Sequence, residues 1–168
     1  MLKKELRKSL LEKRDSLEDI SLSIVSDIIN SKILDNLKKV AIYYPLKKEI
    51  SVLELINHYP SIDFCFPKTK NEIEFFCEKD LSMFKEGKFH CFEPITTNFV
   101  CRDDIDAFII PCVGITKDNG RIGYGKGYYD RYLDGYKGIK IGVIYKELNK
   151  IDFECDPWDL KLDYVFER

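Results

Sequence analysis

Histidine is scarce in this sequence, which contains only His58 and His90, and neither lies at a metal-ligand spacing from a cysteine. The six cysteines include no Cys-x-x-Cys pair, so a structural zinc site is not expected. Two histidines also give little support to a histidine-based catalytic triad. Any catalysis is therefore expected to rest on other side chains.

Long apolar runs are absent as well. No stretch approaches the roughly 18 apolar residues of a membrane span, and the N-terminus is charged from Lys3 onward, unlike a secretory signal. We therefore expect a cytoplasmic protein with no membrane partner, whose cysteines are reduced core thiols, with a disulfide framework as the alternative. A basic surplus is also missing, since the formal net charge is −2, which argues against a nucleic-acid partner.

The composition is that of a globular protein, with 45% hydrophobic and 33% charged residues. A chain of 168 residues can bury one substantial core. No internal repeat, low-complexity tract or linker divides it. We therefore predict a single domain over residues 1–168, and we expect it to be a monomer.

Hydrophobic periodicity predicts the order of helices and strands. Apolar residues at helical spacing predict helices over the first forty residues, with a break near 19–21. Ser51 followed by Glu54 is a capping-box pattern, which predicts a helix start. The alternation of helices with short apolar strands indicates an α/β fold, a three-layer α/β/α sandwich with a mostly parallel central sheet. The predicted strands cover 40–45, 62–67, 73–77, 107–111, 140–145 and 163–167, and the predicted long loops cover 78–105 and 146–160.

The segment 120–133, GRIGYGKGYYDRYL, gathers glycines around two cations. Glycines let the backbone approach a phosphate and turn its N–H groups inward, and a helix N-terminus adds a favourable dipole. Arg121 and Lys126 supply positive charge. The segment follows a buried strand, where α/β proteins place their ligands. We predict a phosphate-binding loop, and the alternative is a glycine-rich turn that serves packing alone.

The familiar P-loop fits this segment poorly. Gly120, Gly125 and Lys126 match its pattern, but Gly127 stands where a P-loop has the Ser or Thr that holds Mg²⁺. Asp130 follows Lys126 by four residues, so on a helix it could pair with that lysine. It could equally help to hold the Mg²⁺ that accompanies a nucleotide, and the residue pattern leaves both interpretations open.

The stretch DNGRIGYGKGYYDRYL, preceded by DAFIIPCVGI, resembles the signature of the 5-formyltetrahydrofolate cyclo-ligase family, also called methenyltetrahydrofolate synthetases. Other parts of the chain are similar to further family segments in the same order, so the resemblance covers nearly the whole sequence. These parts are KKELRKSLLEKRDSL, YYPLKKEISVLELI, FPKTKNEIEFF and DPWDLKLDYVFE.

The resemblance implies an enzyme that uses ATP to close 5-formyltetrahydrofolate to 5,10-methenyltetrahydrofolate, releasing ADP and phosphate. In the implied mechanism the formyl oxygen attacks the γ-phosphate, N10 of the folate attacks the formyl carbon of this phosphorylated intermediate, and phosphate leaves. Phosphoryl transfer asks a protein mainly for positioning and charge neutralisation. Cations and backbone donors without a catalytic triad suit that demand.

The resemblance also implies roles for individual residues. Lys126 and Arg121 are the implied catalytic cations. Asp130 and Asp159 match the metal-associated aspartates, which makes Mg²⁺ the implied cofactor and ATP the co-substrate. The implied ATP-binding residues are Lys3, Lys4, Arg7, Arg121, Gly123, Tyr124, Gly125, Lys126, Gly127, Tyr128 and Tyr129. The implied substrate-binding residues are Tyr44, Glu49, Lys68, Tyr124, Gly125, Lys126, Gly127 and Tyr128.

Several of these residues have a plainer interpretation. Lys3 and Arg7 could form a solvated basic helix face. Glu49 could be an acid favoured by the dipole of a following helix, and Lys68 could be an ordinary surface lysine. Asp159 could be a loop acid near the charged C-terminal segment.

Tyr124 departs from the family pattern, which has a second arginine at this position. Losing that cation removes a charge-assisted contact to a phosphate or to the folate tail, unless another base compensates. Two other functions stay open on the sequence: a nucleotide- or folate-binding module without catalysis, and a small-molecule kinase.

Overall fold

The computed structural model describes all 168 residues and is built on a seven-stranded sheet. Its strands are β1 (Lys39–Ala41), β2 (Asp63–Thr69), β3 (Ile73–Cys77), β6 (Phe99–Val100), β7 (Ala107–Pro111), β10 (Ile139–Ile144) and β11 (Tyr164–Glu167). They lie in the order β11-β10-β7-β1-β2-β3-β6. The five from β11 to β2 run parallel, and β3 is antiparallel to both of its neighbours. The predicted α/β fold with a mostly parallel sheet is confirmed.

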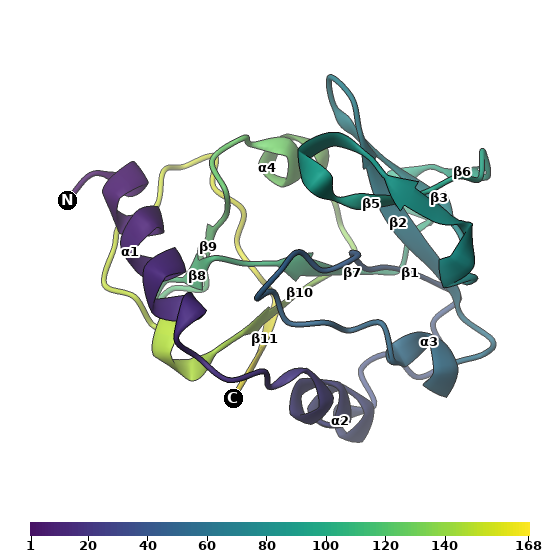
Figure 1. Cartoon of the computed structure of the whole chain (residues 1–168), viewed down its shortest axis with the longest axis horizontal. Helices are drawn as coiled ribbons and strands as arrows, with labels where there is room; N and C mark the ends of the chain where they lie inside the picture. Colours follow the sequence, from purple (N-terminus) through teal and green to yellow (C-terminus); the bar gives the residue numbers. More distant parts are fainter.

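Helices cover both faces of this sheet, as Figure 1 shows with α2 and α3 below it and α4 above it. The helices are α1 (Lys3–Asp15), α2 (Ser21–Ser31), α3 (Leu55–His58) and α4 (Tyr128–Tyr132). In α2 the buried residues Ile24, Val25 and Ile28 recur at helical spacing, which turns one apolar stripe toward the sheet. None of the helices has the length and apolar character that crossing a membrane requires.

The core combines many aliphatic side chains with phenylalanines of β2, β3 and β7. Phe64, Phe66, Phe75 and Phe108 are fully buried. The rings of Phe75 and Phe108 meet edge to face with centroids 5.1 Å apart, a geometry favoured by the ring quadrupoles. Truncating such a phenylalanine to alanine typically costs about 3–5 kcal/mol of stability, so the strands that carry them are a rigid support for the loops at their ends.

Two local predictions are wrong. The helix expected from Ser51 begins only at Leu55, because the Ser51 hydroxyl accepts from the Leu53 N–H in a local turn and its own N–H donates to the Ser21 hydroxyl. The segment 78–105 is no plain loop. It contains the hairpin β4 (Phe84–Glu86) and β5 (Phe92–Pro94) as well as β6. These short strands pair through their backbones without a regular alternation of apolar residues, so the sequence pattern did not reveal them.

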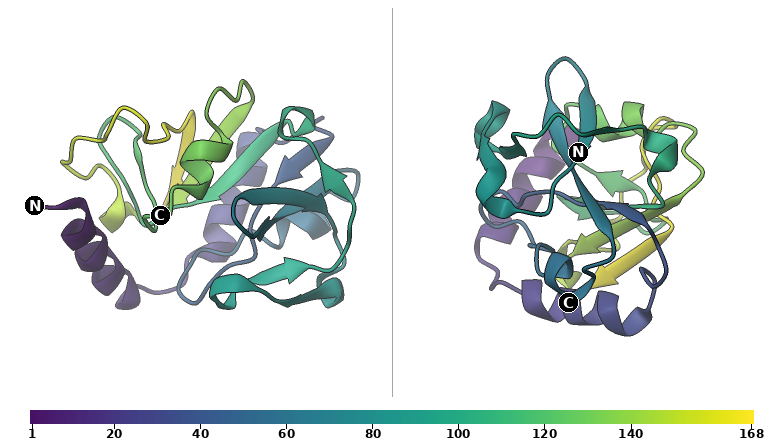
Figure 2. Two further views of the ribbon diagram at one scale, coloured as in Figure 1. Left: turned by 90° about the horizontal axis from the view of Figure 1, so that it is seen from above. Right: turned by 90° about the vertical axis from the view of Figure 1, so that its right-hand side faces the viewer.

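The connections of the parallel strands diverge between β1 and β7. From β1 the chain crosses to β2 on one side, and from β7 it crosses to β10 on the other, through β8 (Gly114–Ile115), β9 (Arg121–Ile122) and α4. Open α/β sheets bind ligands at such a point, outside the carboxyl ends of the strands. Figure 2 shows α1 beside the late segment that precedes β11, and Lys3 of α1 bonds to Asp159 of that segment.

Candidate active site

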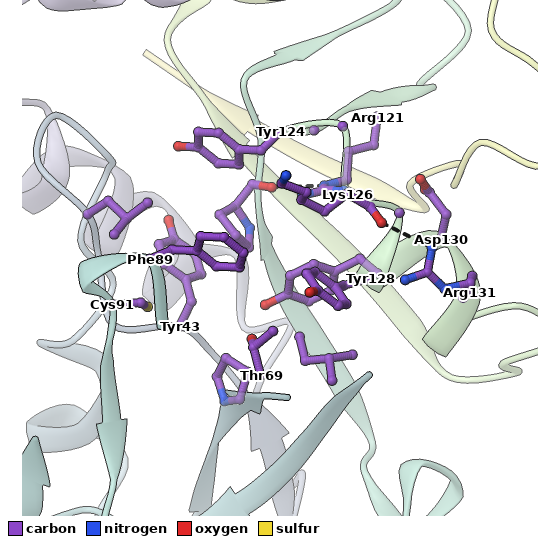
Figure 3. Close-up of a pocket in the computed structure, with 18 of the residues that line it drawn as sticks. Tyr43, Thr69, Phe89, Cys91, Arg121, Tyr124, Lys126, Tyr128, Asp130 and Arg131 are labelled. Atoms are coloured by element: carbon purple, nitrogen blue, oxygen red, sulfur yellow. Dashed lines mark hydrogen bonds between the residues drawn. The ribbon is translucent and has the colours of Figure 1, made fainter. Parts of the chain in front are cut away.

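A cavity of about 780 Å³ opens at the carboxyl ends of β1, β2 and β7. Tyr43 and Tyr44 follow β1, Thr69 ends β2 and Pro111 ends β7, and all four line the cavity. The volume falls within the roughly 300–1,000 Å³ of small-molecule sites. Figure 3 shows the glycine-loop residues Tyr124 and Lys126 on one side of this space and Phe89 and Cys91 on another.

The glycine loop, residues 123–127, leaves β9 and turns directly into α4. Gly125 and Gly127 have φ of 94° and 73°, left-handed values that side chains rarely adopt. Two arginines hold the loop by its carbonyl oxygens: Arg7 Nε donates to Gly123 O at 2.9 Å and Arg131 Nη1 donates to Lys126 O at 3.0 Å. The N–H groups of 124–127 donate to no acceptor within the protein, so they are free for an anion.

Arg121 and Lys126 are among the cations of the cavity wall that lack an acidic partner. Arg121 is 6% exposed, donates through Nε to Pro111 O at 2.8 Å, and makes no ion pair. The Lys126 side chain is exposed and makes no hydrogen bond or ion pair, and its Nζ lies 5.6 Å from the Phe89 ring centroid. The structure does not contain the ion pair between Lys126 and Asp130 that the sequence left open. An anionic ligand would meet both cations uncompensated.

Asp130 and Asp159 come together at the other end of the loop and both line the cavity. Asp130 Oδ1 accepts from the Leu160 N–H at 3.0 Å. Asp159 is buried, and its Oδ2 accepts from Lys3 Nζ at 2.5 Å and from the Asp156 N–H at 2.8 Å. Burial alone lowers the pKa of Lys3, but the bonds and charges of the two aspartates outweigh it and leave that pKa raised.

The second oxygen of each carboxylate, Asp130 Oδ2 and Asp159 Oδ1, has no protein donor. No group of three or more acidic, histidine or cysteine side chains is placed to hold a metal ion. A cation that needs only one or two carboxylates, with ligand oxygens and water completing its shell, is compatible with this donor set.

Glu49 is held at both carboxylate oxygens. Oε1 accepts from the Leu46 N–H at 2.6 Å, and Oε2 accepts from the Tyr124 hydroxyl at 2.8 Å. The same hydroxyl accepts from Arg14 Nη1 at 3.0 Å. Desolvation and the Glu49 carboxylate raise the pKa of Tyr124, which keeps the hydroxyl a proton donor at neutral pH. A cation therefore does stand near position 124, supplied by α1 rather than by the loop.

Two of the residues predicted to bind ligand lie outside the cavity. Lys4 is exposed on α1 and does not line the cavity. Lys68 points elsewhere, since its Nζ donates to Thr96 O at 2.6 Å and lies 4.3 Å from the Phe76 ring centroid. The cavity brings together the other predicted residues: Lys3, Arg7, Tyr44, Glu49, Arg121, Gly123, Tyr124, Gly125, Lys126, Gly127, Tyr128, Tyr129, Asp130 and Asp159.

Sequence reasoning missed several residues of the wall. Phe89 lies at the tip of the β4–β5 hairpin, 52% exposed, with its ring against Lys126. Trp158, the single tryptophan of the chain, is 70% exposed at the rim beside Asp159. Both lie in irregular polar segments, where the sequence has no hydrophobic periodicity that could indicate which side chains face a site. Their exposure as large aromatics is the structural signal that identifies them.

Comparison with known proteins agrees with the sequence resemblance. The model of the 5-formyltetrahydrofolate cyclo-ligase family matches residues 1–167. A Mycoplasma pneumoniae protein named 5-formyltetrahydrofolate cyclo-ligase is 36% identical, over 98% of each chain. A Mycoplasma genitalium protein of the same name is 33% identical, over 97% of this chain and 96% of that one.

Solved structures give the same result. A 5,10-methenyltetrahydrofolate synthetase from Mycoplasma pneumoniae superposes with a TM-score of 0.79 and 33% identity, covering 98% of each chain. The Aquifex aeolicus 5,10-methenyltetrahydrofolate synthetase superposes with a TM-score of 0.85 and 33% identity, covering 99% of this chain and 90% of that one.

Proposed function

The chain belongs to the 5-formyltetrahydrofolate cyclo-ligase family, and we propose that its cavity holds ATP and a formylated folate side by side. The protein is an ATP-dependent cyclo-ligase that converts 5-formyltetrahydrofolate to 5,10-methenyltetrahydrofolate. The observation that carries the proposed arrangement is the glycine loop, whose N–H groups at 124–127 have no acceptor in the protein and which shares the cavity with Arg121 and Lys126.

On the phosphate side, the loop N–H groups bind the triphosphate, and Arg121 and Lys126 neutralise the charge of the transferring group. The formyl oxygen attacks the γ-phosphorus as the bond to ADP breaks. N10 then attacks the formyl carbon and loses its proton, and the carbon–oxygen bond breaks as phosphate leaves. A formamide oxygen is a poor leaving group until it is phosphorylated, so ATP supplies the driving force while the protein supplies positioning and charge.

On the folate side, Glu49 accepts hydrogen bonds from the N–H groups of the pterin ring. Each of its oxygens has one protein donor, and a carboxylate oxygen can accept a further one. Tyr44 and Phe89 offer aromatic faces along the same cavity, which suits a flat ring system. These contacts support a folate site opposite the phosphates.

The donor set supports Mg²⁺ as the cofactor. Asp130 and Asp159 each retain an oxygen without a protein donor, and Mg²⁺ is usually bound by one or two carboxylates together with phosphate oxygens and water. When bound, Mg²⁺ neutralises phosphate charge during transfer. The role of Lys3 is to orient the Asp159 carboxylate through the ion pair that the two residues form.

We also propose that the enzyme acts as a monomer in the cytoplasm. One chain provides every wall of the cavity. The six cysteines are free thiols, the usual state in a reducing compartment.

The decisive experiment is an absorbance assay with purified protein, 5-formyltetrahydrofolate, Mg²⁺ and ATP. We expect the strong near-ultraviolet absorbance of the methenyl product, dependent on ATP and accompanied by ADP. Fluorescence of Trp158 at the cavity rim reports ligand binding independently of turnover. Binding of ATP and folate without product would indicate a non-catalytic module, and a phosphorylated product without the absorbance change would indicate a kinase.

A further inference from the structure

Arg14 is a buried cation without a carboxylate partner. It lies in the last turn of α1, is 7% exposed, and makes no ion pair. Its Nε is the one buried side-chain nitrogen or oxygen in the structure without a hydrogen-bond partner. Burying a guanidinium is costly unless its charge is compensated, so its place in the fold calls for an explanation beyond packing.

The contacts of Arg14 lead to the cavity through Tyr124. Arg14 Nη1 donates to the Tyr124 hydroxyl oxygen at 3.0 Å, and the guanidinium lies 5.8 Å from the centroid of that ring. An arginine side chain has donors only, so the single hydroxyl proton is left for the Glu49 carboxylate, 2.8 Å away. The hydrogen bonds therefore run in one direction, from Arg14 through Tyr124 to Glu49.

There is little room for solvent between Arg14 and Glu49, the first and last residues of this hydrogen-bond series. Arg14 and Glu49 share the lining of a second cavity of about 10 Å³, at the lower limit of the space for one water molecule. Charges in such surroundings interact more strongly than at the surface, and linked hydrogen bonds polarise one another. Arg14 can therefore act on Glu49 without touching it.

We propose that Arg14 and Tyr124 are positioning residues for the folate, holding the Glu49 carboxylate oriented toward ring N–H donors; this rests on the function proposed above. The pair acts on one ligand only. Arg14 Nη1 donates to Tyr124 Oη and Tyr124 Oη donates to Glu49, and neither group bonds to the loop N–H groups that would bind the phosphates. The specificity they confer is for a flat heterocycle with adjacent donors on one edge.

Steady-state kinetics of four variants test the proposal. Tyr124→Phe removes one oxygen and keeps the ring, and we expect the KM for 5-formyltetrahydrofolate to rise on the order of 10-fold, as for loss of a hydrogen bond to a charged group. The KM for ATP and kcat should stay within about 2-fold. Arg14→Met, similar in length and apolar, should raise the folate KM several-fold. Lys13→Met, its exposed neighbour on α1, is the matched control.

The double variant Tyr124→Phe/Arg14→Met separates the proposal from independent packing effects. Residues acting in series are not additive, so the folate KM should equal that of Tyr124→Phe alone. An additive rise overturns the proposal, as does an unchanged folate KM in Tyr124→Phe or an equal rise in both KM values. If Arg14→Met does not fold, the Tyr124→Phe result still decides.

Binding of fragments completes the test without requiring turnover. Pterin carries the ring donors, and p-aminobenzoyl-glutamate carries the tail, so Tyr124→Phe should weaken pterin binding by the same factor as the KM and leave the tail fragment unaffected. Equal weakening of both fragments overturns the proposal. Absence of product from the wild-type enzyme would instead contradict the proposed function, and the pterin measurement would still report on Arg14 and Tyr124.

Discussion

The two walls of the cavity are built differently. The glycine-loop wall, formed by β9, residues 123–127 and α4, is held by partners far away in the sequence. Arg7 reaches Gly123 O from α1, and the Asp130 carboxylate accepts from the Leu160 N–H. The hairpin wall, formed by β4, β5 and residues 87–91 between them, is held by its own pairing, by aromatic contacts to Tyr44 and Phe66, and by the Thr69 N–H, which donates to Glu93.

The backbone of the hairpin wall is also less favourable. Phe89 and His90 have φ of 60° and 57°, although neither is a glycine, and such residues cost of order 1 kcal/mol or more each. Both side chains are exposed, and the His90 contact with Glu86 is a solvent-exposed pair of the kind that contributes little. The hairpin wall therefore has less holding it in one conformation.

This difference fits what each ligand requires. Phosphoryl transfer gains most from donors and cations that are fixed before the reaction begins, and the glycine-loop wall has that character. A bulky folate must enter and its product must leave. Loops that open and close during turnover commonly allow this exchange. Variants on the two walls should therefore differ in which kinetic constant they change.

The largest effect is expected from Lys126→Ala on the glycine-loop wall. The Lys126 ammonium group makes no hydrogen bond or ion pair in the protein, so its charge is free for the transferring phosphate. We expect kcat to fall on the order of 10²-fold or more. Lys137→Ala, also exposed and outside the cavity, is the control, and near-normal turnover of Lys126→Ala would reject the catalytic role.

Next in size is Asp159→Asn on the same wall. The change keeps the shape but removes the charge that pairs with Lys3 and that faces the cavity. We expect the Mg²⁺ concentration for half-maximal activity to rise about 10- to 100-fold. Asp156→Asn, a neighbour that also touches Lys3 but does not line the cavity, should change it less than about 2-fold. Equal effects of the two substitutions would contradict a metal role for Asp159.

Phe89→Ala, on the hairpin wall, should affect folate binding more than the phosphoryl-transfer step. The ring lines the cavity, makes no hydrogen bond, and meets Lys126 only through a contact of 5.6 Å between Nζ and the ring centroid, so we expect the folate KM to rise about 5- to 10-fold and kcat to change less. Phe99→Ala removes a ring of similar exposure, 53% against 52%, outside the cavity. A fall in kcat without a change in folate KM would show that both walls serve the phosphate chemistry.

The smallest effects are on stability, and their signs should be opposite on the two walls. Gly125→Ala forces a side chain into φ of 94° and brings its Cβ to 3.0 Å from Arg7 Cζ, which should cost about 1–2 kcal/mol. His90→Gly removes an exposed side chain from a left-handed position, which should stabilise the fold by about 0.5–1 kcal/mol. Urea unfolding at constant m-value measures both, and equal signs would contradict the comparison.

Much of the sheet could be predicted from local pattern. The apolar run at 107–111 coincides with β7, because a strand buried on both faces must be apolar along its length. The predicted strand at 73–77 coincides with β3, in which Ile73 and Phe75 are buried and Glu74 between them is exposed. The glycine loop was likewise predictable from composition. Ser51 shows the limit of such rules, because a capping pattern cannot reveal that the hydroxyl is used in a turn and the N–H is bonded to α2.

By itself, then, the sequence determined the alternation of buried strands and helices, the glycine loop with its two cations, and through its motifs the family. Only the tertiary structure decided which side chains share the cavity. Lys68 donates to Thr96 O, the Phe89 ring contacts Lys126, and Arg14 donates to Tyr124, which is 110 residues away in the sequence. The physical reason is that periodicity reports whether a residue is buried, whereas the partner of a buried polar group depends on how distant segments pack.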